Sequence, residues 1–216
     1  PVYQQIVSMD AASARASFDN LSGEAYASTR SALLSNSRYL RSALNNRLLA
    51  TSDNRSHVFN GSSQLGHQYA DASGYSGAAS DLQGGAVQAS SLGGWVDAWG
   101  HDGEIDGDGN AAKVDNSGYG FVVGVDTAVG ENSRVGIAAG YEHSKMEVND
   151  NRYSTSETDA LHLAVYGSTS AGPIDLRGGL SYSYLDIDTD RNVWVGSVSG
   201  KNSSSYNAHL FQIFGE

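Results

Sequence analysis

The chain has 216 residues, a formal net charge of −11 and no cysteine. The 24 acidic residues outnumber the 13 basic ones and no Lys/Arg run forms a stripe, which excludes nucleic acid as a partner. The absence of cysteine excludes disulfides and Cys-based zinc sites. No stretch approaches the roughly 18 consecutive apolar residues that a membrane-spanning helix requires, so a helical membrane protein is excluded as well.

Residues 1–50 form the first region of the chain, and they are predicted to be helical. The segment from Gln4 to Ala50 is rich in Ala, Leu, Ser and Arg and lacks proline. An interruption at residues 21–24 divides it into two predicted helices, with Ser22 as the N-cap of the second. In the second helix an apolar stripe recurs mostly at steps of three or four residues, with arginines on the polar side. The stripe comprises Tyr26, Thr29, Leu33, Leu40, Leu44 and Leu48, and the arginines are Arg30, Arg38, Arg41 and Arg47.

Residues 51–93 are predicted to be a Gly/Ser-rich linker. Gly, Ser, Ala, Gln and Asp dominate this region without a sustained period. Residues 94–216 form the third region, which begins where a period of two takes over.

This third region is predicted to contain six antiparallel strands, because apolar residues alternate with small or polar ones. For example, Phe121, Val123 and Val125 share one face, whereas Gly120 and Gly124 share the other. The predicted strands span residues 94–104, 117–129, 133–147, 157–170, 173–188 and 203–215.

The predicted connections between the strands alternate in length. Those at 129–133 and 170–173 are tight, whereas those at 103–116, 149–156 and 188–203 are long, polar and charged. Outer-membrane barrels have short periplasmic turns and longer extracellular loops. The pattern of connections therefore favours such a barrel.

A soluble β-sandwich also alternates apolar and polar residues, but two features favour the barrel. A sandwich has bulky residues on its inner face, whereas the second face here carries Gly, Ala, Ser, Asp, Arg and His. Such a face suits a wet lumen or a surface packed closely by a helix. Strands of about 10 or more residues also match the span of a tilted membrane strand. We therefore expect a mainly β protein built on an antiparallel outer-membrane barrel.

Short pieces of sequence in a fixed order carry a family resemblance. The first are Gly94–Gly100 (GWVDAWG), Asp106–Asn110 (DGDGN) and Gly118–Asp126 (GYGFVVGVD). Later pieces are RVGIAAGY at 134–141, VYG at 165–167, LRGGLSYS at 176–183 and FQIFGE at 211–216. Together they resemble the translocator domain of autotransporters, the proteins of type V secretion. Upstream, FDNLSGE at 18–24 and the Arg/Leu-rich helix resemble the segment between passenger and barrel in this family.

The resemblance implies a twelve-stranded barrel of which this chain supplies the first six strands, with the linker helix in the lumen. It implies location in the bacterial outer membrane and export of an N-terminal passenger, which ends at the cell surface or is secreted. The implied partners are outer-membrane lipid, the chain's own passenger and the outer-membrane barrel-assembly machinery. The sequence departs from the family at Glu216, where the C-terminal strand and terminal aromatic residue are missing. We expect six strands alone to leave two open edges, which hydrocarbon does not tolerate.

Charged residues on the small, polar face of the strands are the candidate site residues. They are Asp97, Asp126, Arg134, Glu142, Asp175 and Arg177. In a barrel they would face the lumen, where they could pair with one another and with helix arginines such as Arg38 and Arg41. We expect these pairs to seat the helix in the pore; a role in gating or translocation is the alternative.

Two other motifs are weaker candidates for chemistry. One branch of the family severs its passenger at an Asn-Asn pair, and Asn45-Asn46 lies at the end of the second predicted helix. The flanking residues do not reproduce that branch's motif, so self-cleavage is not favoured. Asp106, Asp108 and Asn110 resemble half of a calcium loop, but position 117 is Ser117 where an EF-hand requires glutamate.

No other pattern predicts a cofactor, a metal or an enzyme. The six histidines never fall at i, i+4 on a helix, and no nucleophile elbow, phosphate loop or dinucleotide fingerprint is present. The sequence therefore predicts a translocator module without catalytic activity. The alternative is a soluble extracellular β-rich binding or adhesion domain whose loops 101–116 and 188–203 contact a ligand.

Overall fold

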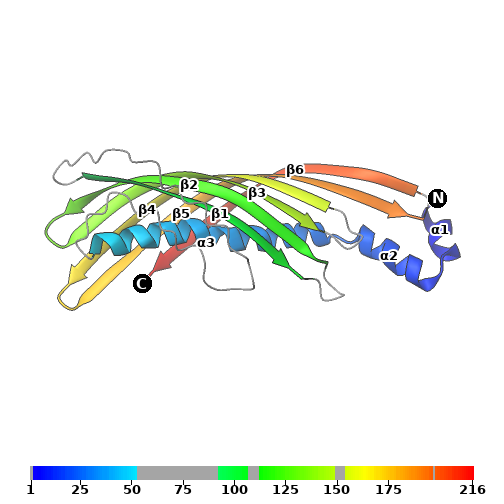
Figure 1. Ribbon diagram of the computed structural model, residues 1–216, viewed down its shortest axis with the longest axis horizontal. Coiled ribbons are helices and arrows are strands. Elements are labelled where there is room, and N and C mark those ends of the chain that lie inside the picture. Colours follow the sequence, from blue (N-terminus) through cyan, green and yellow to red (C-terminus); the bar gives the residue numbers. More distant parts are fainter. Residues whose placement is uncertain (1, 53–91, 107–111, 149–153, 197) are drawn as a thin grey trace.

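The computed structural model describes residues 2–52, 92–106, 112–148, 154–196 and 198–216. Most of the predicted linker 51–93 and most of the DGDGN motif lie outside these residues. The described chain consists of three helices followed by six strands, and the helices lie along one face of the sheet and beyond its end (Figure 1).

The helical region contains three helices rather than the two predicted. They are α1 (Val2–Ser8), α2 (Ala11–Leu21) and α3 (Glu24–Ser52). The break before α2 forms because the carboxylate of Asp10 accepts hydrogen bonds from the backbone N–H groups of Ala12 and Ser13, each at 2.9 Å. Such an N-cap satisfies helix donors that have no intrahelical partner.

The predicted role of Ser22 is wrong. Its backbone N–H donates to the carbonyl of Asp19 at 3.1 Å, so Ser22 closes α2, and α3 begins two residues later at Glu24. The interruption was therefore placed correctly, but its residues serve the end of the preceding helix.

The six predicted strands are confirmed, and they form one antiparallel sheet in the order β1-β2-β3-β4-β5-β6. The strands are β1 (Leu92–Ile105), β2 (Val114–Val129), β3 (Ser133–Val148), β4 (Ser154–Ala171), β5 (Ile174–Val195) and β6 (Val198–Gly215). The predicted long loop at 188–203 is wrong, because its residues continue β5 and β6 as a ladder that extends to Val195 and Val198. Polar residues fill this hairpin without ending the strands.

The two faces of the sheet differ as the alternation predicts. The outward face carries exposed apolar side chains in its central rows, including Ile137 (60% exposed), Leu161 (60%) and Leu163 (58%). The inward face carries small residues and buried polar side chains such as Ser181, Ser183 and His162. An apolar outer band combined with a polar interior is the pattern of a transmembrane barrel wall.

Helix α3 lies along the inward face, and the sheet curves around it (Figure 1). Leu40, Leu44 and Leu48 are at most 2% exposed and pack in one cluster with Trp99 and Val122. Burying a leucine side chain contributes roughly 1.5–3 kcal/mol. The apolar stripe therefore holds the middle and C-terminal part of α3 against the sheet.

The two ends of the sheet differ in their connections. The turns β2–β3 and β4–β5 need only residues 130–132 and 172–173, with Gly130 (φ 69°) and Gly172 (φ 64°) in the left-handed region. We call this the short-turn end. The opposite end, where β1–β2, β3–β4 and β5–β6 connect, is called the long-loop end after its first two connections; β5 and β6 are separated there by residues 196–197 alone. The C-terminus of α3 lies toward the short-turn end, whereas α1 and α2 lie at the long-loop end (Figure 1).

Candidate functional site

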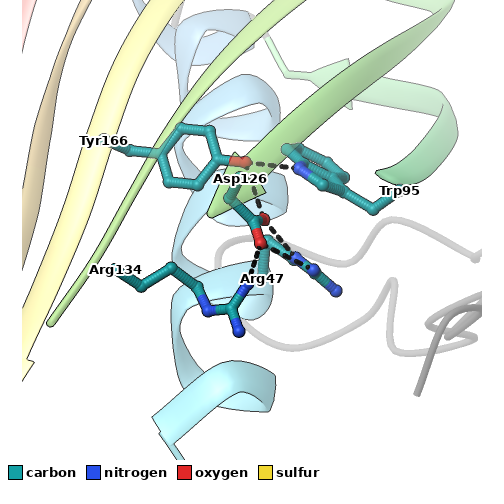
Figure 2. Close-up of polar contacts among 5 residues, drawn as sticks. All are labelled: Arg47, Trp95, Asp126, Arg134 and Tyr166. Carbon is teal, nitrogen blue, oxygen red and sulfur yellow. Dashed lines mark hydrogen bonds and ion pairs between the residues drawn. The ribbon is translucent and has the colours of Figure 1, made fainter. Parts of the chain in front are cut away.

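A buried carboxylate binds α3 to the sheet near the short-turn end. Arg47 on α3 donates from Nε to Oδ2 of Asp126 at 2.7 Å and from Nη2 to Oδ1 at 3.0 Å. Arg134 on β3 donates from Nη1 to the same Oδ1 at 2.5 Å. The Asp126 side chain is completely buried, so two guanidinium groups enclose it on the inner face of the sheet. Figure 2 shows Asp126 between them.

Two aromatic side chains complete this arrangement. The hydroxyl of Tyr166 on β4 donates to Asp126 Oδ2 at 3.0 Å, and the indole Nε1 of Trp95 on β1 donates to the Tyr166 hydroxyl at 2.5 Å (Figure 2). The two rings meet edge to face, with centroids 5.9 Å apart. We call Arg47, Trp95, Asp126, Arg134 and Tyr166 the Asp126 network. It joins α3 to four neighbouring strands.

The register of the sheet explains how the network assembles. Asp126 lies between Gly93 on β1 and Gly136 on β3, and Gly136 lies opposite Tyr166 on β4. A Cβ atom at Gly136 would overlap the Tyr166 ring and lie 2.7 Å from the Asp126 Cβ. Because Gly136 has no side chain, Tyr166 reaches across β3 to the carboxylate.

The position of Arg47 follows from helix geometry. Arg47 is seven residues after Leu40 and three after Leu44, so it lies on the same face as these buried leucines. Its side chain is only 12% exposed. Bidentate pairing matches the planar fork of a guanidinium to a carboxylate, which gives a directional contact. Arg47 therefore fixes both the position of α3 along the sheet and its rotation.

The network depends most on its carboxylate, because Asp126 carries the one negative charge among the five network residues. One carboxylate faces two guanidinium groups, and the Arg134 side chain is 29% exposed. Removing one partner of a buried ion pair leaves an uncompensated buried charge, which costs about 3–5 kcal/mol. The network thus favours one seated position of the helix over displaced ones.

The structure brings two of the predicted site residues, Asp126 and Arg134, together with a helix arginine. That arginine is Arg47 and not the predicted Arg38 or Arg41. Arg38 and Arg41 are exposed. Arg38 donates to the hydroxyl of its neighbour Tyr39 at 3.0 Å, and within the described residues neither arginine forms an ion pair with a strand. The sequence placed Arg47 on the polar side with the other arginines, and a helical wheel does not separate it from Arg41, which has the same spacings of three and seven residues from Leu44 and Leu48. Only the rotation of α3 against the sheet buries Arg47 and leaves Arg41 exposed.

The remaining predicted residues lie elsewhere on the sheet. Glu142 is buried on the inward face, with Oε2 at 3.8 Å from Nε2 of His162, and His162 Nδ1 is 2.7 Å from the Ser183 hydroxyl. Asp97 lies half-buried on the same face of β1. The structure places these groups apart from the Asp126 network.

Asp175 and Arg177 lie close to the short-turn end of β5. Asp175 is exposed and accepts a hydrogen bond from the Ser170 hydroxyl at 2.6 Å across the turn. The Arg177 guanidinium lies 3.7 Å from the carboxylate of Glu216 on the neighbouring chain segment. Both residues therefore interact with neighbouring strand residues rather than with α3.

Asn45 and Asn46 lie within α3, which continues unbroken to Ser52. Asn45 is half-buried at the flank of the leucine stripe, whereas Asn46 is exposed on the opposite side of the helix. Among the described residues, no group of three or more His, Cys, Asp or Glu side chains is arranged to hold a metal ion. None of the described helices is both long and apolar enough to span a membrane.

The arrangement of an apolar outer band, a polar inner face and a helix bound inside it agrees with the sequence comparisons. The family model described as the autotransporter beta-domain matches residues 94–216, which is more than half of the chain. The chain belongs to this family. Autotransporter beta-domains are outer-membrane barrels, so the chain is part of a translocator barrel in the bacterial outer membrane.

Two relatives of this autotransporter chain are both named extracellular serine protease and both come from Serratia marcescens. One is 28% identical over 99% of the chain, and the other is 28% identical over 90%. The chain spans only 18% and 16% of the length of these relatives. The comparison with solved structures gave no significant match.

Proposed function

We propose that this chain helps to deliver an N-terminal passenger to the cell surface and that its helix α3 is the seated end of the exported segment. The observation that supports this best is the bidentate pair of Arg47 and Asp126. It binds α3 to the polar inner face, where an exported segment would come to rest. Trp99, Val122 and the leucine stripe support the same placement by packing.

We assign the short-turn end of the sheet to the periplasm and the long-loop end to the cell surface, following the usual arrangement of outer-membrane barrels. In this orientation the C-terminus of α3 lies on the periplasmic side and α2 lies outside. The N-terminal passenger would then continue from the external end of the helix. The partners that follow are outer-membrane lipid at the apolar band, the passenger itself and the barrel-assembly machinery.

The proposed role is not catalytic. The matched relatives are named proteases, but the family match lies in the translocator region of this chain. Asn45 and Asn46 directly precede Arg47, but among the described residues no hydrogen bond joins their side chains to the Asp126 network, and the proposed function makes no use of them. Replacing both with alanine should leave the size of the surface-exposed passenger unchanged on gels of whole cells.

The experiment for export places a small reporter domain directly before residue 1 in the full-length precursor. On intact cells the reporter should be digested by added protease while a periplasmic marker protein survives. If the reporter becomes accessible only after the outer membrane is permeabilised, although the barrel is folded in that membrane, the proposed export function is wrong.

The experiment for helix seating uses Arg47→Met, with Arg41→Met as the matched control on the exposed side of the same helix. Arg47→Met should keep the reporter at the surface but raise ion conductance through the purified full-length protein in planar bilayers, because α3 loses its bond to Asp126. The control should keep the wild-type conductance. Equal conductance of both variants would contradict the seating role.

A further inference from the structure

The long-loop end of β5 has an edge that β4 does not cover. β4 begins at Ser154, which pairs with Arg191, whereas β5 continues to Val195. Among the described residues, β5 from Asn192 onward pairs with β6 alone. The backbone groups on its other side must therefore find partners outside the sheet, because unpaired strand edges are costly and prone to wrong pairing.

A side chain of α2 occupies this edge. Asn20 donates from Nδ2 to the carbonyl of Asn192 at 3.2 Å and accepts at Oδ1 from the backbone N–H of Trp194 at 2.7 Å. The carbonyl of Asn192 and the N–H of Trp194 point to the same side of β5, where a neighbouring antiparallel strand would form hydrogen bonds with them. The carboxamide of Asn20, only 3% exposed, thus makes the two hydrogen bonds that a neighbouring strand would make at this edge.

A charged contact reinforces the same junction. The guanidinium of Arg191 donates to the carbonyl of Ser22 at 2.5 Å and to that of Asn20 at 3.4 Å. Carbonyls at the end of a helix lack intrahelical donors and attract cations. The same guanidinium lies 5.7 Å from the ring centroid of Tyr26 at the start of α3. Arg191 therefore contacts the end of α2 and the beginning of α3 together.

The tip of the hairpin also fits the preceding helix. Gly196 adopts φ 61°, and a Cβ atom there would lie 2.7 Å from both the Gln5 side chain and the Met9 methyl group. The contact between the β5–β6 tip and residues 5–9 is therefore close, and a side chain at position 196 would displace the ends of the Gln5 and Met9 side chains. Helices α1 and α2 lie against the hairpin end in Figure 1.

We propose that the end of the β5–β6 hairpin is a docking site for the chain's own α1–α2 segment and sets the path by which that segment leaves the pore. We call Asn20, Ser22, Arg191, Asn192 and Trp194 the hairpin clasp. The clasp closes only when α3 has reached its seated position, because Asn20 and α3 are separated by three residues. This inference rests on the proposed export function, which places α2 outside the barrel.

The test is trypsin digestion of intact cells that carry the full-length precursor, since Arg15 is exposed on α2. In Asn20→Ala, cleavage after Arg15 should be on the order of tenfold faster than in the wild type, because two hydrogen bonds are lost and α2 opens more often. Alanine favours helix, so faster cleavage would not reflect a weaker helix. The barrel-bound product should begin at Ala16, which mass spectrometry identifies.

A second variant and a control separate docking from folding. Arg191→Gln should accelerate cleavage after Arg15 as well, whereas Asn207→Ala, on the exposed side of β6, should not. Arg30 belongs to α3, which lies along the inward face of the sheet. Cleavage after Arg30 therefore indicates that α3 itself has been displaced, and not only α2. Faster cleavage after Arg15, without faster cleavage after Arg30, supports the clasp.

Failure of the clasp and failure of the proposed function give different results. If neither Asn20→Ala nor Arg191→Gln changes the cleavage rate more than about twofold, the clasp is wrong, while export stands. To test location separately, Ala11→Cys adds the first cysteine to this chain. If a membrane-impermeant maleimide labels Cys at position 11 only after outer-membrane permeabilisation, α2 is not outside, and the clasp and the export function both fail.

Discussion

At its C-terminal end α3 is bound by a buried ion pair, whereas at its N-terminal end it is held through hydrogen bonds with backbone groups, made by the Asn20 carboxamide and by Arg191. Asp126 is enclosed by Arg47, Arg134 and Tyr166. Asn20 makes two hydrogen bonds to the free edge of β5. One contact lies on the inner face of the sheet and the other at its solvent-facing end.

The difference indicates two different tasks. A buried charge tolerates little displacement of its partner, because separating the two leaves each charge without water. A neutral amide at the rim can exchange its partners for water at a cost of only about 0.5–1.5 kcal/mol per hydrogen bond. The C-terminal contact therefore sets the register of the helix, and the N-terminal contact guides a segment that can still open.

The largest effect should come from Asp126→Asn. It leaves Arg47 and Arg134 facing each other without a carboxylate, so the free energy of unfolding of the full-length protein in detergent should fall by about 3–5 kcal/mol. Urea titration measures the change. The double variant Arg47→Gln with Asp126→Asn should lose less than the sum of the two single changes. Additive losses would mean that the two residues do not interact.

The next largest effect should come from Leu44→Ala, because Leu44 is completely buried against the sheet. Loss of its side chain should cost about 2–5 kcal/mol in the same titration. Leu34→Ala is the control, since Leu34 is 52% exposed on the same helix. A similar loss in both variants would show that apolar packing does not distinguish the two sides of α3.

A small effect is expected from Arg38→Gln and Arg41→Gln, because these arginines are exposed and have no ion pair with the described strands. Each should change the free energy of folding by less than about 0.5 kcal/mol. A loss of about 3 kcal/mol from either would mean that the helix is seated by several arginines rather than by Arg47.

The smallest effect should be a pH dependence confined to α2. Hydrogen bonds from the backbone N–H and hydroxyl of Ser13 hold the pKa of Asp10 below its ordinary value of 3.8. A lowered pKa in the folded state stabilises α2 above pH 4, and this contribution is lost as the pH falls through the folded value. Hydrogen exchange of residues 11–21, corrected for intrinsic rates, should therefore show weaker protection at pH 3 than at pH 5.

Asp10→Asn keeps a good N-cap but cannot titrate, so it should remove the difference between pH 3 and pH 5. Exchange in α3 residues 40–48 should be the same at both pH values. A pH-dependent change that persists in Asp10→Asn would assign the effect to another group.

The sheet was largely predictable, and the helix contacts were not. Alternation along residues 117–129 identified the outward face, because burial on one side imposes a period of two. The hairpin at 188–203 was mistaken for a loop because its charged and polar residues resemble loop composition. Composition could not show that the backbone ladder continues there.

The sequence predicted the strand residues of the candidate site but not the helix residue that binds them. Asp126 and Arg134 stood out as charges on an otherwise small face, but their partner Arg47 depends on how α3 is rotated. The row Gly93, Asp126, Gly136 and Tyr166 depends on strand register, which joins residues far apart in sequence. Asn20 carried no sequence signal at all, because its partners are backbone groups of a strand about 170 residues away.

The length of β5 has a mechanical consequence. Its 22 residues, at about 3.3 Å each, measure roughly 70 Å, whereas a strand needs only about 9–11 residues to cross a bilayer. About half of this strand or more therefore lies outside the hydrocarbon core. Backbone hydrogen bonds between β5 and β6 continue without a break from the membrane-spanning part to the external part. A force applied to the external segment is therefore transmitted directly to the barrel.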